Sequence, residues 1–228
     1  MTTARPHLGK RVQHRMHHRF SWLLAAEFAL IVGSPMLQNL GVNPGQYGLL
    51  GFAVFTAALY TVIGEGRLTA VAFILGGAAI AFNISASFAG VGVASLPGLV
   101  FGALFMGLVT AVILRSVMTS TRVTVETLYG AVAAYVLLGL TWGAVYFLVE
   151  TIAPASFRSS LAPAAPVLWP DCLFFSFITL TTIGYGDIVP VGNMAKSLVV
   201  LEAVTGIMYP AVMIGRLIAM HSTLSRER

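Results

Sequence analysis

The stretch Thr181-Thr182-Ile183-Gly184-Tyr185-Gly186-Asp187 decides how the rest of the chain is interpreted. Glycine stands at alternate positions, 184 and 186, and it tolerates backbone angles that residues with a Cβ resist. A column of carbonyl oxygens turned to one side requires such angles. Four such columns around one axis can replace the water shell of a dehydrated cation. The predicted ion-binding residues are Thr182, Ile183, Gly184, Tyr185 and Gly186.

The composition is that of an integral membrane protein. The chain has 228 residues, of which 57% are hydrophobic and only 9% charged, whereas a soluble domain is about a quarter charged. The single cysteine, Cys172, excludes an intramolecular disulfide framework and most thiolate metal sites. The net charge of +5 reflects membrane topology rather than nucleic-acid binding, because the basic residues cluster by position along the chain.

Long apolar segments predict an all-α fold with six transmembrane helices. Crossing a bilayer takes about 20 apolar residues. Between the fifth and sixth segments, residues 168–182 are apolar but too short to cross, which indicates a re-entrant pore helix. The six predicted spans are 20–40, 47–63, 68–88, 96–118, 125–149 and 194–220.

Basic residues predict the orientation of these spans. With the N-terminus inside, all but two of the 13 basic residues fall on the cytoplasmic side, as the positive-inside rule requires. Only Arg158 and Lys196 lie outside. We therefore expect a cell-membrane protein with both termini cytoplasmic and the 181–187 stretch opening to the outside.

Residues 125–220 resemble the two-helix pore domain of potassium channels, whose filter signature is T-x-G-Y-G-D. The resemblance implies a pore helix at about 170–182, a filter at 182–186 and K⁺ bound at Thr182, Ile183, Gly184 and Tyr185. One filter in the chain implies a homotetramer, because the pore needs four. The residues predicted to support the filter are Thr181, Asp187, Phe174, Phe175, Ile178 and Glu202.

These supporting positions carry distinct expectations. In the family an aromatic pair on the pore helix packs around the filter tyrosine, which implies that Phe174 and Phe175 contact Tyr185. Some members place an acidic brace where this chain has Ile178, so that brace is absent. Glu202, an intramembrane acid, is expected behind the filter, hydrogen-bonded to Thr181 or Ser176.

The last span contains two candidate gate residues. Gly206 lies where the family often has a hinge glycine, and Pro210 removes a helix hydrogen bond one turn later. A bend near the inner mouth is the favoured interpretation, and tight packing at Gly206 is the alternative.

The first four spans, 20–124, form a four-helix domain of unassigned role. The family's voltage sensors carry arginine at every third position of the fourth span, but residues 96–114 hold no charge. A conventional voltage sensor is therefore not expected. Glu27 and Asn83 are the polar groups of this domain that can pair.

The sequence thus predicts passive potassium conduction, without an enzymatic reaction or a cofactor. Residues 1–19 are a basic cytoplasmic leader with histidines, and 221–228 a short cytoplasmic tail. The expected partners are K⁺, lipid and other copies of the chain, with no nucleic acid. Two alternatives stay open: a weakly selective cation channel, and a membrane sensor whose four-helix unit binds a lipid or small ligand.

Overall fold

The computed structural model describes residues 19–40, 44–63, 66–88, 96–120 and 124–226. Residues 1–18 of the predicted leader and the last two residues of the tail lie outside these ranges. Helices form nearly all of the described chain, in the order α2 (Arg19–Asn39), α3 (Pro44–Val62), α4 (Arg67–Phe88), α5 (Leu96–Thr119), α6 (Val125–Ile152), α7 (Trp169–Leu180) and α8 (Asn193–Arg226).

Local sequence explains where the pore-forming helices begin. The Thr124 side chain accepts a hydrogen bond from the Thr127 amide at 3.2 Å and so caps α6. At the start of α7, Pro170 occupies the first turn, where a missing N–H is not needed. The Asp171 carboxylate accepts the Leu168 amide at 2.8 Å and complements the positive end of the helix.

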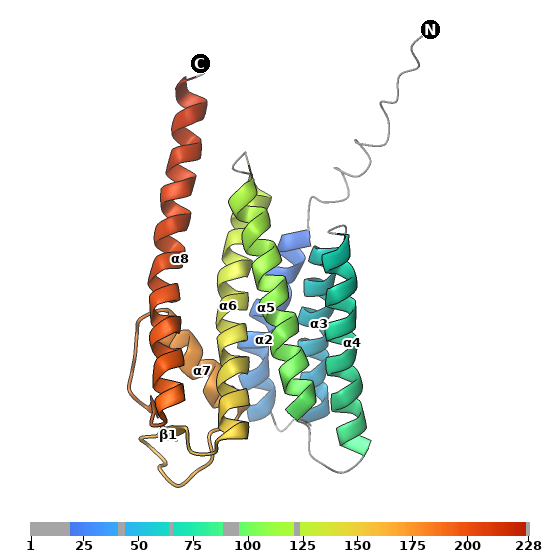
Figure 1. Cartoon of the computed structure of the whole chain (residues 1–228), viewed down its shortest axis with the longest axis vertical. Coiled ribbons are helices and arrows are strands. Elements are labelled where there is room, and N and C mark those ends of the chain that lie inside the picture. The colour runs from blue at the N-terminus through green and yellow to red at the C-terminus, as the bar shows by residue number, and fades with distance from the viewer. Residues whose placement is uncertain (1–18, 41–43, 64–65, 89–95, 121–123, 227–228) are drawn as a thin grey trace.

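Helix α6 is the centre of the molecule (Figure 1). Helices α2 and α5 pack on one side of it, and α7 packs on the other and carries α8. Helices α3 and α4 complete the first four-helix unit at the far side from α8. The four-helix unit therefore rests on the pore segment of its own chain.

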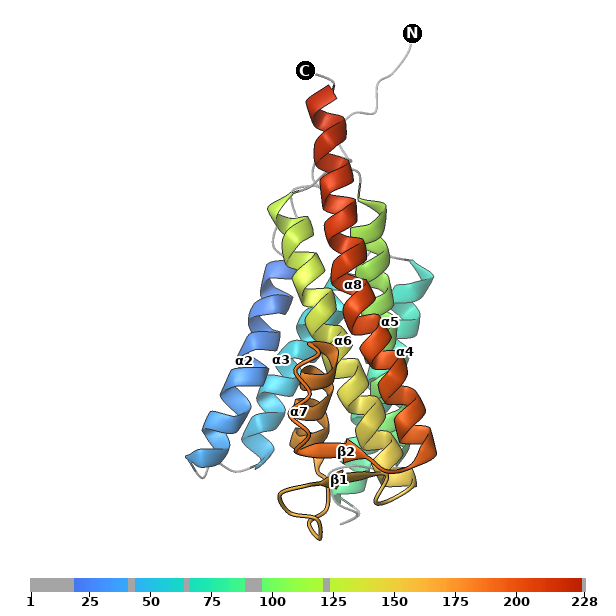
Figure 2. The same ribbon diagram turned by 90° about the vertical axis from the view of Figure 1, so that its left-hand side faces the viewer.

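A short two-stranded ribbon joins the α6–α7 segment to the α7–α8 segment, and the all-α prediction missed it. Strand β1 (Phe157–Ser159) pairs antiparallel with β2 (Ile188–Pro190), so that Arg158 lies opposite Val189. Figure 2 shows this ribbon at the end of the molecule opposite the C-terminal end of α8. Three-residue strands are too short to leave a periodic pattern in sequence.

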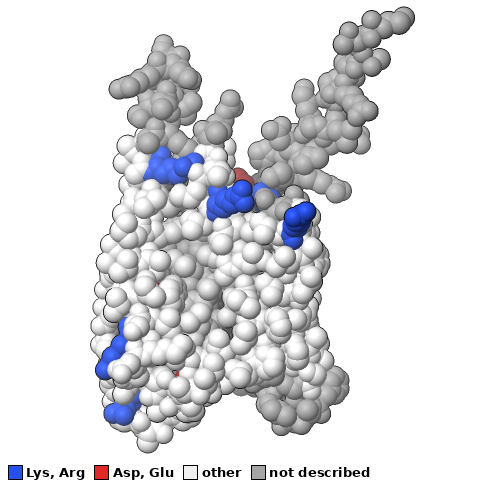
Figure 3. All heavy atoms as spheres, viewed as in Figure 1, with Lys and Arg blue, Asp and Glu red and all other residues white. Residues whose placement is uncertain are grey.

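The surface is consistent with a bilayer environment. In Figure 3 the Lys and Arg side chains lie toward the two ends, and the broad band between them is almost free of charge. Four helices in the described residues are long and apolar enough to cross a membrane: Arg67–Ser85, Leu96–Thr119, Val125–Ile152 and Asn193–Arg216. Helices α2 and α3, with 21 and 19 residues, are the two further spans that the sequence predicts.

The pairing of Glu27 with Asn83 that the sequence left open is not formed. Glu27 is fully buried, and neither of its carboxyl oxygens has a hydrogen-bond partner among the described residues. Asn83 instead donates its side-chain amide to the Ala79 carbonyl of its own helix at 2.8 Å. The amide of a helical asparagine can reach the preceding turn of its own backbone, and here that contact is formed.

Candidate functional site

The backbone of the 181–187 stretch alternates in conformation. Positive φ angles occur at Thr182 (62°), Gly184 (56°) and Gly186 (79°), and not at Ile183 or Tyr185. Alternating φ signs turn successive carbonyls toward the same side, as an ion filter requires. Glycine adopts such angles freely, whereas the non-glycine Thr182 bears a local strain that is typical of functional sites.

The amide groups of this stretch are fixed to the pore helix. The Thr182 amide donates to the Thr179 carbonyl at 3.0 Å, and the amides of Ile183 and Gly184 donate to the Ile178 carbonyl at 2.9 and 3.1 Å. Ile178 thus supports the filter through its backbone oxygen. The acidic brace of the family is absent, but these three backbone hydrogen bonds hold the filter against α7.

The carbonyl groups on the other side of the stretch are left without protein donors. Among the described residues, no hydrogen bond reaches the carbonyl oxygens of Thr182, Ile183, Gly184 or Tyr185. All four residues are exposed on the single chain. Buried backbone carbonyls almost always have a partner in folded proteins, whereas these exposed ones remain available to one. Four consecutive unsatisfied oxygens therefore form a strip suited to a cation or to water.

Gly186 differs from the other predicted ion ligands. Its carbonyl accepts the Ser160 hydroxyl at 2.8 Å, and the Ser160 amide donates to the Asp187 carbonyl at 2.7 Å. Ser160 follows β1 directly, and the pairing of β1 with β2 brings it to the outer end of the filter. Gly186 therefore supplies a backbone conformation here, and its assignment as an ion ligand is not supported by the direction of its oxygen.

The two aromatic residues of the pore helix diverge. Phe174 stacks on Tyr185, with ring centroids 6.5 Å apart and planes within 8°. Phe175 lies instead in a buried cluster with Tyr146 and Phe157, at 5.4 and 5.5 Å. Consecutive residues of a helix point about 100° apart. The side chain of Phe174 therefore points to the filter, whereas that of Phe175 points to α6. Within the single chain Phe174 alone of this pair stacks on Tyr185, and a contact of Phe175 with a filter tyrosine stays a prediction.

Glu202 joins three helices behind the filter. This fully buried carboxyl of α8 accepts the Ser176 hydroxyl of α7 at 2.5 Å and the Tyr146 hydroxyl of α6. Of the two partners expected from sequence, the structure selects Ser176. The Thr181 hydroxyl turns back to the Phe177 carbonyl at 2.6 Å.

Removing this carboxyl should destabilise the pore domain. Glu202→Ala leaves the buried Tyr146 hydroxyl without its acceptor, at a cost of about 1–3 kcal/mol, whereas the Ser176 hydroxyl keeps the Gly139 carbonyl at 2.8 Å. We expect a clear fall in the thermal midpoint, measured by tryptophan fluorescence in detergent. Leu161→Ala in the loop between α6 and α7 is the control, because Leu161 is 85% exposed. A Glu202→Ala protein as stable as that control would contradict this role.

Close packing fixes the pore helix between α6 and α8. A Cβ at Gly139 or Gly143 of α6 would lie 2.6 Å from Phe177 and 3.1 Å from Leu173. The Gly-x-x-x-Gly spacing that allows this approach is visible in the sequence and was missed. It is the signal that identifies the α6 face on which α7 rests.

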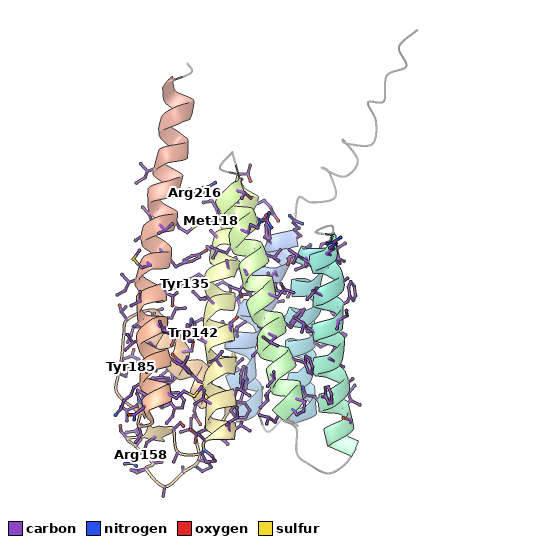
Figure 4. The ribbon with its side chains drawn as sticks, viewed as in Figure 1. Met118, Tyr135, Trp142, Arg158, Tyr185 and Arg216 are labelled. Carbon is purple, nitrogen blue, oxygen red and sulfur yellow. The ribbon has the colours of Figure 1, made fainter. Side chains whose placement is uncertain are left out.

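The predicted hinge glycine lies at a tight contact. A Cβ at Gly206 would lie 2.3 Å from the carbonyl oxygen of Leu180, the last residue of α7. The Tyr135 hydroxyl donates to the same oxygen at 3.1 Å, and Figure 4 shows Tyr135 on the α6 side that faces α8. Helix α8 continues past Pro210 to Arg226. The packing alternative therefore gains direct support, while bending at Gly206 stays a prediction.

Between Tyr209 and Arg216, α8 is hydrogen-bonded to other segments of its own chain at two points. The Tyr209 hydroxyl donates to the Ala131 carbonyl of α6 at 2.6 Å. The Arg216 guanidinium donates to the Ser120 carbonyl at 2.7 Å, just beyond the end of α5. A cation is favourable beside the negative end of a helix.

Comparison with known proteins places these features in a family. The family described as "Ion channel" matches residues 134–222. Protein LctB of Bacillus caldotenax is 30% identical over 123 residues, which cover 49% of this chain and 91% of that protein. No solved structure matches the chain.

Two shorter matches are to potassium channels. The inward rectifier potassium channel Kirbac3.1 of Paramagnetospirillum magnetotacticum is 47% identical over 49 residues, which cover 22% of this chain and 17% of that protein. The potassium channel protein kcv of Paramecium bursaria Chlorella virus 1 is 31% identical over 65 residues, or 27% and 69% of the two chains. The predicted resemblance to potassium channels is confirmed. The prediction of a channel rather than an enzyme is confirmed by the same matches. The chain belongs to the ion channel family.

Proposed function

We propose that the protein is a potassium-selective channel in which four copies of the chain surround one filter. The carbonyl oxygens of Thr182, Ile183, Gly184 and Tyr185 bind K⁺, and conduction is passive and needs no cofactor. The observation that carries this proposal is the strip of four carbonyls without protein donors, backed by amides bound to α7. The relatives that are named as potassium channels support the choice of ion.

The tetramer rests on the same site and on an apolar face of α8. One carbonyl strip cannot surround an ion, and closed symmetry supplies the other three. Between residues 200 and 208 of α8, five large apolar side chains are more than half exposed on the single chain, as is expected of residues that face lipid or another subunit. They are Val200, Leu201, Val204, Ile207 and Met208.

The proposed membrane arrangement has six spans, with both termini cytoplasmic and the filter mouth outside. Asp187 would then contribute to a ring of four carboxylates at the outer entrance and attract cations. The separation of basic side chains to the two ends of the molecule supports a transmembrane orientation (Figure 3). The uncharged stretch of α5 supports gating by something other than a conventional voltage sensor.

Ion flux from liposomes tests the proposal. Vesicles that contain the purified protein and a potassium gradient should release potassium, and barium, which is close in size to K⁺ but doubly charged, should block the release. Equal release of sodium would favour the weakly selective cation channel instead. Vesicles without protein and vesicles with Gly184→Ala protein are the controls.

The sensor alternative has one feature in its favour. A cavity of about 450 Å³ lies between α3, α4 and α5, within the size range of ligand sites. It is lined by apolar side chains and Asn83, including Phe52, Phe55, Ile80, Ile84, Phe105 and Met106. Conduction by pure protein in plain phospholipid, without any added ligand, would count against a ligand requirement.

A further inference from the structure

Two glutamates of the described residues are fully buried, Glu27 and Glu202, and they differ in their hydrogen bonding. Glu202 accepts hydrogen bonds from Ser176 and Tyr146. Both carboxyl oxygens of Glu27 lack a partner among the described residues, although the side chain has no exposed surface. A buried polar group without a partner in a native fold requires an explanation.

The surroundings of Glu27 are apolar and closely packed. It lies on α2 between Leu23, which is fully buried, and Leu30, and both belong to a cluster shared with α3 and α6. Near the start of α2, Phe20 packs so tightly on α6 that a Cβ at Gly130 would lie 3.0 Å from its ring. Glu27 itself has no exposed surface, so the packed arrangement leaves it no contact with bulk water.

No cation faces Glu27 from the helices packed on α2, in the described part of the chain. Arg19 of α2 donates to the Thr61 carbonyl, eight residues before Glu27. The side chains described on α3 include one titratable group, Tyr60, which is 47% exposed. The titratable groups of α6 have other partners or are exposed: Glu126 accepts the Phe20 amide, Tyr135 and Tyr146 donate to Leu180 and Glu202, Glu150 accepts two loop amides, and Tyr129 is 41% exposed.

We propose that Glu27 binds a proton and that this proton determines whether α2 packs against α6 or separates from it. An unpaired carboxylate is too costly to bury, so the packed arrangement holds the neutral, protonated acid. Loss of the proton creates a charge that the interface cannot accommodate. Helix α2 then has to separate from α6 and admit water to the carboxylate.

This movement would reach the pore through α6. The face of α6 that receives α2 includes Gly130, and further along the same helix Gly139 and Gly143 receive the pore helix α7. A movement of α2 relative to α6 therefore alters the packing of α6 against α7, the helix to which the filter amides are hydrogen-bonded. This second step rests on the proposed channel function, whereas proton binding at Glu27 does not.

Stability as a function of pH tests the proton site without any need for conduction. Glu27→Met keeps the length of the side chain and removes the acid. If Glu27 stays protonated in the fold but ionises in the unfolded chain, wild-type stability falls relative to Glu27→Met as pH rises above about 4. The gap between their thermal midpoints should grow by about 3 °C for each pH unit. Parallel midpoints from about pH 5 to about pH 8 would overturn the proposal.

Flux as a function of pH tests the link to the pore. Wild-type potassium flux should change severalfold between about pH 5 and about pH 9. An exposed glutamate titrates near pH 4 and would already be ionised over most of this interval. Glu27→Met should hold the low-pH level throughout, and Glu27→Gln should behave similarly. Two controls should keep the wild-type profile: Leu30→Met, an apolar change in the same cluster, and Glu126→Gln, a carboxyl change at the same interface.

The two measurements separate the possible failures. A Glu27→Met profile of flux identical to that of wild type would overturn the coupling. Absence of flux from every protein at every pH would refute the channel function, while the midpoints would still decide whether Glu27 binds a proton.

Discussion

Gly184→Ala should abolish potassium flux while the protein still folds and inserts into the membrane. Gly184 has a φ of 56°, which costs an alanine about 1–2 kcal/mol, and the four chains incur this cost at one filter. Alanine would relieve the strain by rotating toward negative φ. That rotation breaks the alternation and turns a carbonyl away from the ion. Reconstituted flux and size-exclusion chromatography give the two readouts.

The matched control for this change is Gly77→Ala in α4. Gly77 is exposed, and a Cβ there meets no atom within 4 Å. In a helix, alanine is favoured over glycine by about 1 kcal/mol. We expect wild-type flux from Gly77→Ala. Normal flux from Gly184→Ala would show that the alternating backbone at 184 is not needed for conduction.

Gly206→Ala should prevent stable folding or assembly of the pore domain. The added Cβ would lie 2.3 Å from the Leu180 carbonyl oxygen, a backbone atom that cannot move without displacing the end of α7. Overpacking of this kind costs about 1–3 kcal/mol and occasionally more. It would also weaken the hydrogen bond from Tyr135 to the same oxygen. The thermal midpoint and the recovered fraction of assembled protein measure the effect.

Gly215→Ala on the same helix provides the comparison. No atom lies within 4 Å of a Cβ at Gly215 in the single chain, so this change should leave the midpoint near that of wild type. If Gly206→Ala were equally stable but altered the open fraction of the channel, the hinge interpretation would be favoured over packing. The two roles of Gly206 are thereby separated in one pair of variants.

The sequence was most informative where function constrains the backbone directly. Gly184 and Gly186 were predicted as positions of unusual backbone conformation, and both have positive φ. Thr182 shares that conformation, but a threonine gives no such signal, because side chains with a Cβ usually avoid it. Pro170 and Asp171 were likewise interpretable, since the start of a helix has specific local requirements.

Contacts between distant segments could not be predicted in the same way. Ser160 reaches the filter only because β1 pairs with β2, and nothing in the sequence of the loop fixes that register. The separation of Phe174 from Phe175 follows from the rotation of α7 relative to α6. The isolation of Glu27 became visible only when every neighbour of α2 was known.

The current reversal potential with potassium on one side and sodium on the other tests the central claim most directly. Purified protein in a planar bilayer should give a reversal potential far from zero, with the sign expected when potassium alone carries current. Barium should block that current. A reversal potential at zero, with sodium and potassium carrying equal current, would contradict the claim that the carbonyl strip of residues 182–185 selects potassium.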